Sequence, residues 1–287
     1  MVDWAGVMSI RSFVIAVLTS FVTSADAVAS GHGPVFGAAT PTLGRGAWSV
    51  DQAWTMRVGD QSRNEQMFKT MVTFGVTETL QVSASIPELM SDNTLAPARM
   101  MNAMSNDREL ESLVAYRFHR TPVGVGGRRE STLYVGGTIP LEHSRFGLSA
   151  GPSFVVSAAT GYAGRTHYVW FGGALQHYFP SDGERLGDSR TVTFVYGYRP
   201  SVFRADSGRP DLRFFVESTF EDRQPVESAS ARVAEPARTL FIGPTSLSVY
   251  KAIALSGGLQ WAVNKENNVG AAERVRVAVN FSYFFFR

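Results

Sequence analysis

The sequence of 287 residues contains no cysteine. Disulfides, thiol nucleophiles, cysteine-ligated metal sites and a lipid anchor on an N-terminal cysteine are therefore excluded. Charge of one sign is scarce as well, because 27 basic and 25 acidic residues are interspersed and leave a formal net charge of +2. So small a bias gives no support for a nucleic-acid partner.

Long apolar runs are almost absent. The one exception, residues 13–22, follows Arg11 and precedes a small-residue segment that contains Ala27 and Ala29. A run this short cannot span a bilayer as a helix, and its position before an A-x-A site is typical of a secretory signal peptide. We therefore predict a signal peptide over residues 1–29, cleaved after Ala27 or Ala29. An uncleaved anchor or a buried helix is the alternative.

No later apolar segment approaches the length of a transmembrane helix, so any membrane-spanning part must use strands. The composition favours strands and turns, since the chain has 27 glycines, 20 phenylalanines and 12% aromatic residues.

The C-terminal segment shows the clearest strand pattern, because apolar and polar residues alternate along it. The apolar positions are Val275, Val277, Val279, Phe281, Tyr283 and Phe285, and the polar or small ones between them are Arg276, Ala278, Asn280 and Ser282. A period-two segment of about ten residues has the length that a tilted strand needs to cross a bilayer.

Similar segments recur along the chain, and we count about twelve. They are residues 47–59, 65–77, 80–86, 109–119, 133–141, 147–158, 166–179, 191–199, 212–221, 239–249, 253–264 and 274–285. The sequence therefore predicts an all-β fold for residues 30–287, a transmembrane antiparallel up-and-down β-barrel. A soluble sandwich would leave the signal peptide and the long last strand unexplained.

The connections between these segments alternate in length. An even strand count places both chain ends in the periplasm of a Gram-negative bacterium, and the long polar connections 88–107, 181–189 and 222–237 then fall outside the cell. Short turns inside and long loops outside are the rule for outer-membrane barrels. Segments 120–130 and 200–210, read as periplasmic loops, are longer than this rule favours.

The last residues, Tyr283-Phe284-Phe285-Phe286, resemble the aromatic signal that the barrel-assembly machinery reads on the final strand, although Arg287 follows them. The resemblance implies the barrel-assembly machinery as a partner, and the predicted transmembrane barrel implies the lipids of the outer membrane as another.

Several short pieces resemble a family of outer-membrane barrels associated with the meta-pathway of phenol degradation (MetA). They are Pro41-Thr42-Leu43-Gly44-Arg45-Gly46, Gly75-Val76-Thr77, Leu80-Gln81-Val82-Ser83, Pro87, Ala115-Tyr116-Arg117-Phe118 and Phe241-Ile242-Gly243-Pro244. The resemblance implies a transporter-like barrel that handles hydrophobic or aromatic compounds, and it brings no catalytic residues.

Charged side chains on the polar faces of the segments are expected to line the barrel lumen. These candidates are Asp51, Arg57, Lys69, Glu109, Glu111, Arg117, Arg213, Glu217, Arg274 and Arg276. Charges of both signs in a narrow barrel form either a polar passage or a plug-like ionic network, and the sequence leaves both open.

A mouth loop is predicted within residues 88–107. Its methionines, Met90, Met100, Met101 and Met104, fit either a short amphipathic cover or an adaptable gate, because flexible thioethers remake contacts easily.

Catalysis and metal binding find little support. The five histidines are scattered and show no spacing of a metal site. His143-Ser144 lies near a strand end, but no third group orients a Ser-His pair, so a lipid hydrolase is the least favoured function. We expect no enzyme activity and no cofactor.

The leading hypothesis is an outer-membrane channel for passive passage of small molecules of unknown identity, with hydrophobic or aromatic compounds as candidates. The alternative is a structural or adhesive barrel whose outer loops carry the function.

Overall fold

The computed structural model describes residues 33–59, 64–89, 109–140, 151–181, 184–203, 209–225, 227–228, 237–266 and 273–285. The predicted signal peptide and the four methionines of the mouth loop lie outside the described residues. In the part of the chain that is described, no helix has the length and apolar character needed to cross a membrane.

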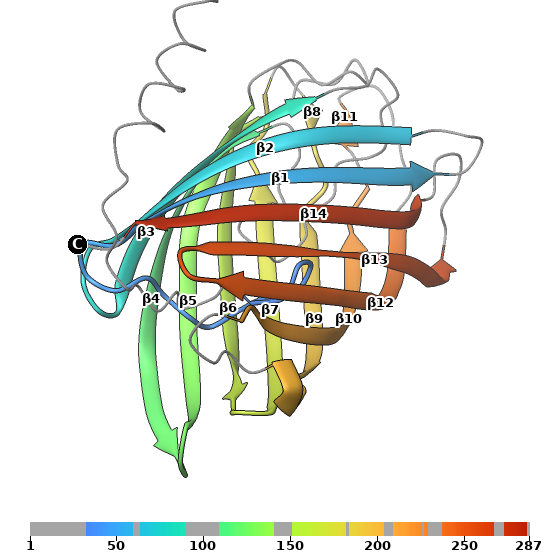
Figure 1. Ribbon diagram of the computed structural model, residues 1–287. Coiled ribbons are helices and arrows are strands. Elements are labelled where there is room, and N and C mark those ends of the chain that lie inside the picture. Colours follow the sequence, from blue (N-terminus) through green and yellow to red (C-terminus); the bar gives the residue numbers. More distant parts are fainter. Residues whose placement is uncertain are drawn as a thin grey trace, which may run out of the picture.

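Twelve antiparallel strands close into one barrel (Figure 1), so the predicted fold class and strand count are confirmed. The strands are β1 (Trp48–Gly59), β2 (Asn64–Gly75), β3 (Leu80–Leu89), β4 (Glu109–Val123), β5 (Gly127–Pro140), β6 (Ser153–Ala163), β7 (His167–Tyr178), β9 (Ser189–Tyr198), β10 (Asp211–Arg223), β12 (Ala237–Tyr250), β13 (Ile253–Glu266) and β14 (Glu273–Phe285). Each pairs with its neighbours in sequence, and β1 closes the ring on β14. Closure removes every sheet edge, as a strand-built membrane protein requires.

The two short strands outside the ring, β8 (Glu184–Arg185) and β11 (Glu227–Ser228), pair with each other. They belong to two of the connections that sequence analysis placed outside the cell. We call this side of the barrel the loop end and the opposite side, which carries the short turns, the turn end.

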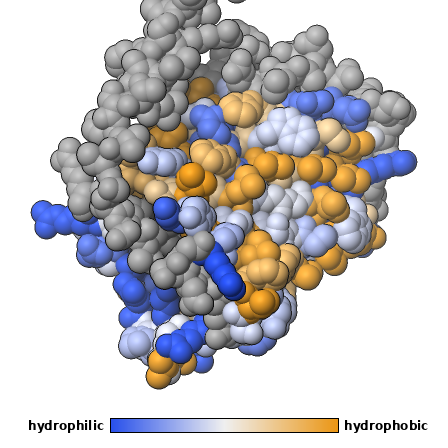
Figure 2. Space-filling model, in the orientation of Figure 1, coloured by the Kyte–Doolittle hydropathy of each residue, from blue (hydrophilic) through white to orange (hydrophobic). Residues whose placement is uncertain are grey.

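Period-two alternation sorts the side chains between the two surfaces of the barrel. In β7, Tyr168, Trp170 and Gln176 are buried, whereas Phe171 and Leu175 are exposed. The same pattern around the ring leaves a belt of apolar side chains on the outside, and Figure 2 shows them gathered over the strands. An apolar outer belt matches the hydrocarbon core of a bilayer.

Segment 120–130 corrects one expectation of a long loop. β4 continues to Val123 and β5 begins at Gly127, so only three residues form the turn. Gly124 and Gly126 have positive φ angles of 61° and 77°, which glycine adopts without strain. The other long periplasmic segment contains a short 3₁₀ helix, η2 (Ser201–Phe203).

The chain before β1 lies inside the barrel. Most residues of 33–47, which we call the lumen segment, are buried, and the segment contacts the inner faces of several strands, among them β3 and β10. Residues 30–287 were predicted to form the barrel, but the sequence carries no sign that the first part of this range crosses its interior.

Candidate functional site in the barrel lumen

Glu217 of β10 anchors the lumen segment. The backbone N–H groups of Val35, Phe36 and Gly37 donate to its two carboxylate oxygens at 2.8, 2.8 and 2.7 Å. The Thr245 hydroxyl of β12 donates to the same carboxylate, which is completely buried. Successive N–H groups form an anion-binding nest, and here the anion is supplied by the barrel wall. Each charge-assisted bond of this kind contributes about 1.5–3 kcal/mol.

Gly37 lets the lumen segment approach the wall closely. A Cβ atom at this position would lie 2.4 Å from Cγ2 of Val195 on β9. Any larger residue would push the segment away from Glu217, so the anchor depends on glycine here.

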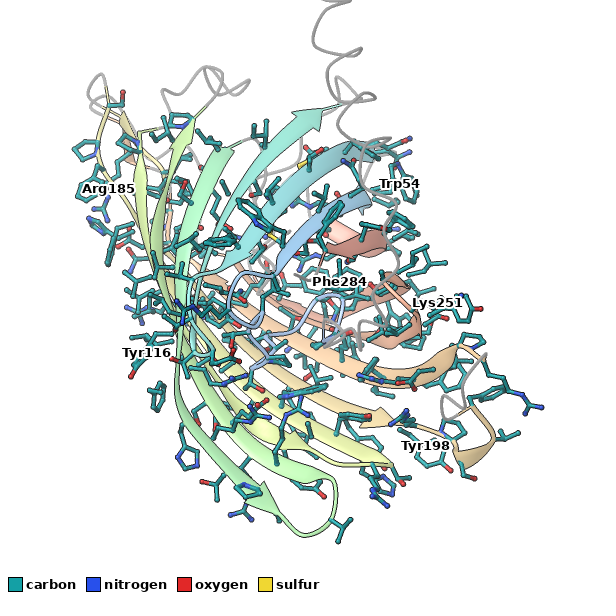
Figure 3. All side chains as sticks on the ribbon, turned by 60° about the vertical axis from the view of Figure 1, so that its left-hand side comes forward. Trp54, Tyr116, Arg185, Tyr198, Lys251 and Phe284 are labelled. Atoms are coloured by element: carbon teal, nitrogen blue, oxygen red, sulfur yellow. The ribbon has the colours of Figure 1, made fainter. Side chains whose placement is uncertain are left out.

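The rest of the lumen segment is held by side chains from several strands. Thr132 and Tyr134 of β5 donate to the carbonyls of Thr40 and Ala39 at 2.6 and 2.5 Å. Trp170 of β7 donates to the Thr40 hydroxyl at 3.2 Å, and Gln81 of β3 accepts from the Leu43 N–H at 2.8 Å. Further bonds join Ala38 to Thr193 and Thr42 to the Glu78 carbonyl. The segment thus runs from β10 across the lumen to β3, as the trace inside the barrel in Figure 3 shows, and narrows the passage.

Aromatic side chains fill the lumen near the turn end. Tyr168 and Trp170 of β7 stack at 5.4 Å between ring centroids, and both approach Phe215 of β10, at 6.2 and 6.0 Å. Leu43 of the lumen segment and Phe284 of β14 belong to the same buried cluster. This cluster makes one part of the interior near the turn end apolar.

An ion-pair network fills the lumen near the loop end. Arg276 of β14 donates to both oxygens of Glu221 on β10, at 2.5 and 2.9 Å, and also pairs with Glu273. Arg57 of β1 bridges Glu273 and Glu65 at 2.9 and 3.2 Å. Every member is buried, and the Arg276 guanidinium also lies 3.7 Å from the centre of the Phe241 ring. Together the groups join four strands, β1, β2, β10 and β14.

Eight of the ten lumen candidates from the sequence have buried side chains inside the barrel: Asp51, Arg57, Lys69, Glu109, Glu111, Arg117, Glu217 and Arg276. Arg213 is half-buried, pairs with Asp211 at 2.7 Å and lies over the Tyr168 ring. Arg274 is exposed instead, because the β1–β14 pairing shifts register there and the face alternation is broken.

Several lumen residues were missed by the sequence analysis. Glu65, Glu130 and Gln260 are buried on inner faces, and strict alternation within their strands would have identified Glu65 from its spacing to Lys69. Glu273 could not be found in this way because the register shift separates it from Arg276.

Three exposed histidines, His119, His167 and His177, lie away from the lumen. His167 contacts the Tyr196 hydroxyl at 2.9 Å and His177 contacts Asp188 at 3.1 Å, both with exposed rings. No cluster of three or more possible metal ligands occurs within the described residues.

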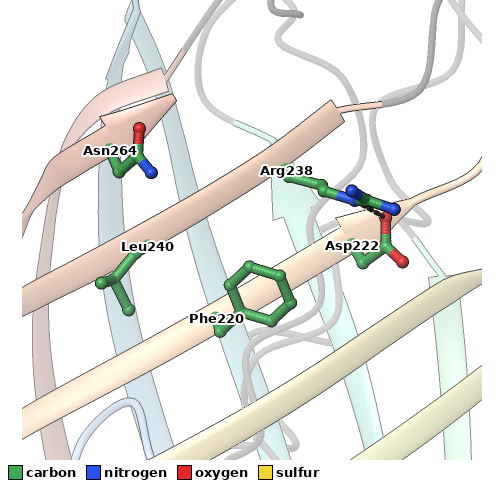
Figure 4. A pocket seen from close by; sticks show the side chains of 5 residues that line it. All are labelled: Phe220, Asp222, Arg238, Leu240 and Asn264. Atoms are coloured by element: carbon green, nitrogen blue, oxygen red, sulfur yellow. Dashed lines mark hydrogen bonds and ion pairs between the residues drawn. The ribbon is translucent and has the colours of Figure 1, made fainter. Parts of the chain in front are cut away.

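A pocket of about 340 Å³ lies outside the lumen, on the outer wall near the loop end. The apolar Phe220 and Leu240 line it together with Asn264 and the Asp222–Arg238 ion pair, which spans 3.2 Å (Figure 4). Its position in the barrel wall excludes a part in the passage through the lumen.

Comparisons with solved structures show the fold. The crystal structure of a COG4313 outer membrane channel from Pseudomonas putida F1 matches with a TM-score of 0.60 and 13% identity, over 88% of this chain and 100% of that one. Two weaker matches cover 83% of this chain at 9% identity. The KdgM porin has a TM-score of 0.44 and is covered over 99% of its own length, and LpxR from Salmonella typhimurium has a TM-score of 0.43 and is covered over 100%. These two are too distant to carry an argument. No family profile and no curated protein matches the sequence.

Proposed function

We propose that the chain is a channel in the outer membrane of a Gram-negative bacterium, through which small molecules pass passively. The observation that carries the proposal is a closed barrel with an apolar outside and a largely polar inside, whose interior is narrowed, among the described residues, by the lumen segment. The COG4313 channel, which shares the fold, supports this assignment.

The test is single-channel conductance in planar bilayers, with the full chain and with a variant that lacks residues 33–43. The deletion touches no hydrogen bond between barrel strands, so the barrel should still fold. We expect small steady openings from the full chain and a severalfold larger conductance from the variant. Folded protein that stays silent in both forms would contradict a channel.

The proposal extends to hydrophobic or aromatic solutes, as the resemblance to the MetA family implies. The aromatic cluster at the turn end supports it, because Tyr168, Trp170 and Phe215 pack beneath the lumen segment and would face a solute once that segment moves aside. Liposome swelling with benzoate, phenol and glucose tests it. Faster entry of the aromatic solutes relative to glucose is expected, and the preference should weaken in Trp170→Ala.

A second function, a structural or adhesive barrel without transport, is favoured by one observation. The lumen segment and the ion-pair network together occupy much of the interior at two levels. A folded deletion variant without conductance would support this reading.

Export and assembly form part of the same proposal. Cleavage after Ala27 or Ala29 should be visible as the mass of the mature protein. On β14, Tyr283 and Phe285 contact each other on the outer face at 4.6 Å between centroids, while Phe284 points into the lumen. We therefore propose that, among the described residues of this motif, Tyr283 and Phe285 are the side chains that contact the assembly machinery.

The mouth loop completes the proposal. Deleting residues 91–104 should leave the barrel folded and change uptake or selectivity, because these residues lie outside the described strands. Transport indistinguishable from that of the parent would mean that the loop only covers the barrel.

A further inference from the structure

The β4–β5 hairpin extends further from the barrel than the other turns (Figure 1). Hydrophilic residues gather over this end of the molecule at the lower left of Figure 2. The hairpin lies at the turn end, opposite the ion-pair network. Its charged side chains take part neither in that network nor in the anchor of the lumen segment at Glu217.

A register shift places three arginines on one face of this hairpin. The pairing of β4 with β5 shifts between Arg117 and His119, so that Arg120 pairs with Glu130 and Pro122 with Arg128. Arg117 and Glu130 are buried on the lumen side. Arg129, one residue away from both Arg128 and Glu130, is exposed on the outer face.

All three arginines converge on one oxygen atom. Nη1 of Arg117, Nε of Arg120 and Nε of Arg128 lie 3.4, 3.5 and 3.0 Å from Oε1 of Glu130. One carboxylate oxygen cannot satisfy three guanidinium groups, each of which carries five N–H donors. Nε of Arg117 is buried and makes no hydrogen bond to the described residues. Nε of Arg128 is buried as well, and its 3.0 Å approach to Glu130 is an ion pair without the geometry of a hydrogen bond.

Neighbouring charges leave the cluster positive. Arg117 also donates to the backbone carbonyl of Glu78 at 2.6 Å, and the exposed Glu78 carboxylate in the β2–β3 turn is the second nearby anion. Arg165 lies beside the hairpin turn, where its Nε would be 2.5 Å from a Cβ on Gly126. Three guanidinium groups therefore lie within 3.5 Å of the Glu130 carboxylate, and Glu78 is the second nearby anion.

We propose that the lumen face of this hairpin binds a small oxyanion, a carboxylate or a phosphate, through Arg117, Arg120 and Arg128. Guanidinium groups match the planar, two-oxygen geometry of such anions, and the unused N–H donors would be satisfied by a second anion beside Glu130. The biological role of this site rests on the proposed channel function, because the site would bind anionic solutes at the turn-end mouth of the lumen. The binding itself can be measured without transport.

The test is calorimetric titration of the folded, detergent-solubilised chain with inorganic phosphate. Arg120→Gln and Arg128→Gln each remove one charged donor and should raise the dissociation constant about tenfold. Arg129→Gln removes the same charge one residue away, on the outer face, and should change it by less than about twofold. Arg120→Lys keeps the charge without the forked geometry and should give an intermediate value.

Two results would overturn the site. One is a parent protein that does not bind phosphate; the other is an effect of Arg129→Gln as large as that of Arg128→Gln, which would indicate an unspecific charge effect. Nanodiscs test whether lipid headgroups supply the anion. Phosphate should bind equally in zwitterionic and anionic discs, because the site faces the lumen, and competition by anionic lipid would contradict that placement.

Transport separates this inference from the proposed function. Phosphate binding by a barrel that conducts nothing would refute the channel and leave the site. A conducting barrel without phosphate binding would refute the site alone. If both hold, anion permeability relative to cation permeability should fall in Arg128→Gln and stay unchanged in Arg129→Gln.

Discussion

The two ends of the lumen are filled in different ways. At the loop end the filling is part of the wall, since Arg57, Glu65 and Arg276 and their partners project from the strands and tie them to one another. At the turn end the filling is a separate piece of chain, the lumen segment, whose backbone is satisfied by wall side chains such as Glu217. Disrupting the ion-pair network should therefore lower the stability of the barrel, whereas detaching the lumen segment should widen its passage.

The largest expected effect is the loss of stability when the ion-pair network at the loop end is broken. Arg276→Ala leaves the buried Glu221 and Glu273 without their shared partner, and removing one member of a buried ion pair costs about 3–5 kcal/mol. The free energy of unfolding, from a urea titration in detergent, should fall by that amount. Arg274→Ala removes an exposed arginine two residues away and should change it by less than about 0.5 kcal/mol. Equal losses would mean that the network does not stabilise the wall.

The next effect concerns the anchor at the turn end. Glu217→Ala leaves three consecutive N–H groups without an acceptor, at a cost of about 1–3 kcal/mol for each group that finds no water. We expect the lumen segment to detach, which satisfies these groups with water while the strands stay paired. Conductance should rise and hydrogen exchange of residues 35–37 should accelerate.

The control for this anchor is Ser218→Ala, the neighbouring position on the outer side of β10. It should leave conductance and exchange unchanged. If the barrel of Glu217→Ala unfolds together with the lumen segment in one cooperative transition, the segment is not separable from the barrel wall and the comparison fails.

A smaller effect is expected at Gly37. Gly37→Ala places a methyl group against Val195, and overpacking of this kind costs about 1–3 kcal/mol. Conductance should change in the same direction as in Glu217→Ala, but less. Gly44→Ala is the matched control, because a Cβ there meets only an ordinary contact at 3.7 Å with Glu78. Identical behaviour of the two variants would show that close approach to Val195 does not matter.

The smallest effect belongs to the exposed loop end. Burial alone would raise the pKa of Asp188, but hydrogen bonds and charges from Arg185 and His177 outweigh it and hold that pKa below its usual range. A depressed carboxylate pKa contributes stability above the ordinary value of 3.8, and the contribution is lost as the pH falls through the lower, folded value. Protection of the backbone amides around Asp188 against hydrogen exchange, relative to their intrinsic rates at each pH, should therefore fall in that acid range, and Asp188→Asn should abolish this pH dependence of the protection.

Sequence and structure agree best where strands repeat their pattern. β14 shows why: Val277 and Val279 face outward and Ala278 and Asn280 inward, as the alternation predicted. Agreement fails at Arg274, where one shifted residue turns a predicted lumen side chain outward. A register shift is a property of two paired strands, so the sequence of one strand does not reveal it.

The sequence by itself determined the all-β class, the number of barrel strands and the face on which most residues lie. The reason is that the alternation of apolar and polar residues with a period of two is a local property of each strand. Only the tertiary structure decided what fills the lumen. The lumen segment has no periodic pattern of its own, and its anchor joins residues 180 to 182 positions apart. Its conformation follows from acceptors that exist only once the barrel has closed. The same holds for the three arginines around Glu130, which meet because a bulge and a turn bring two strands into register.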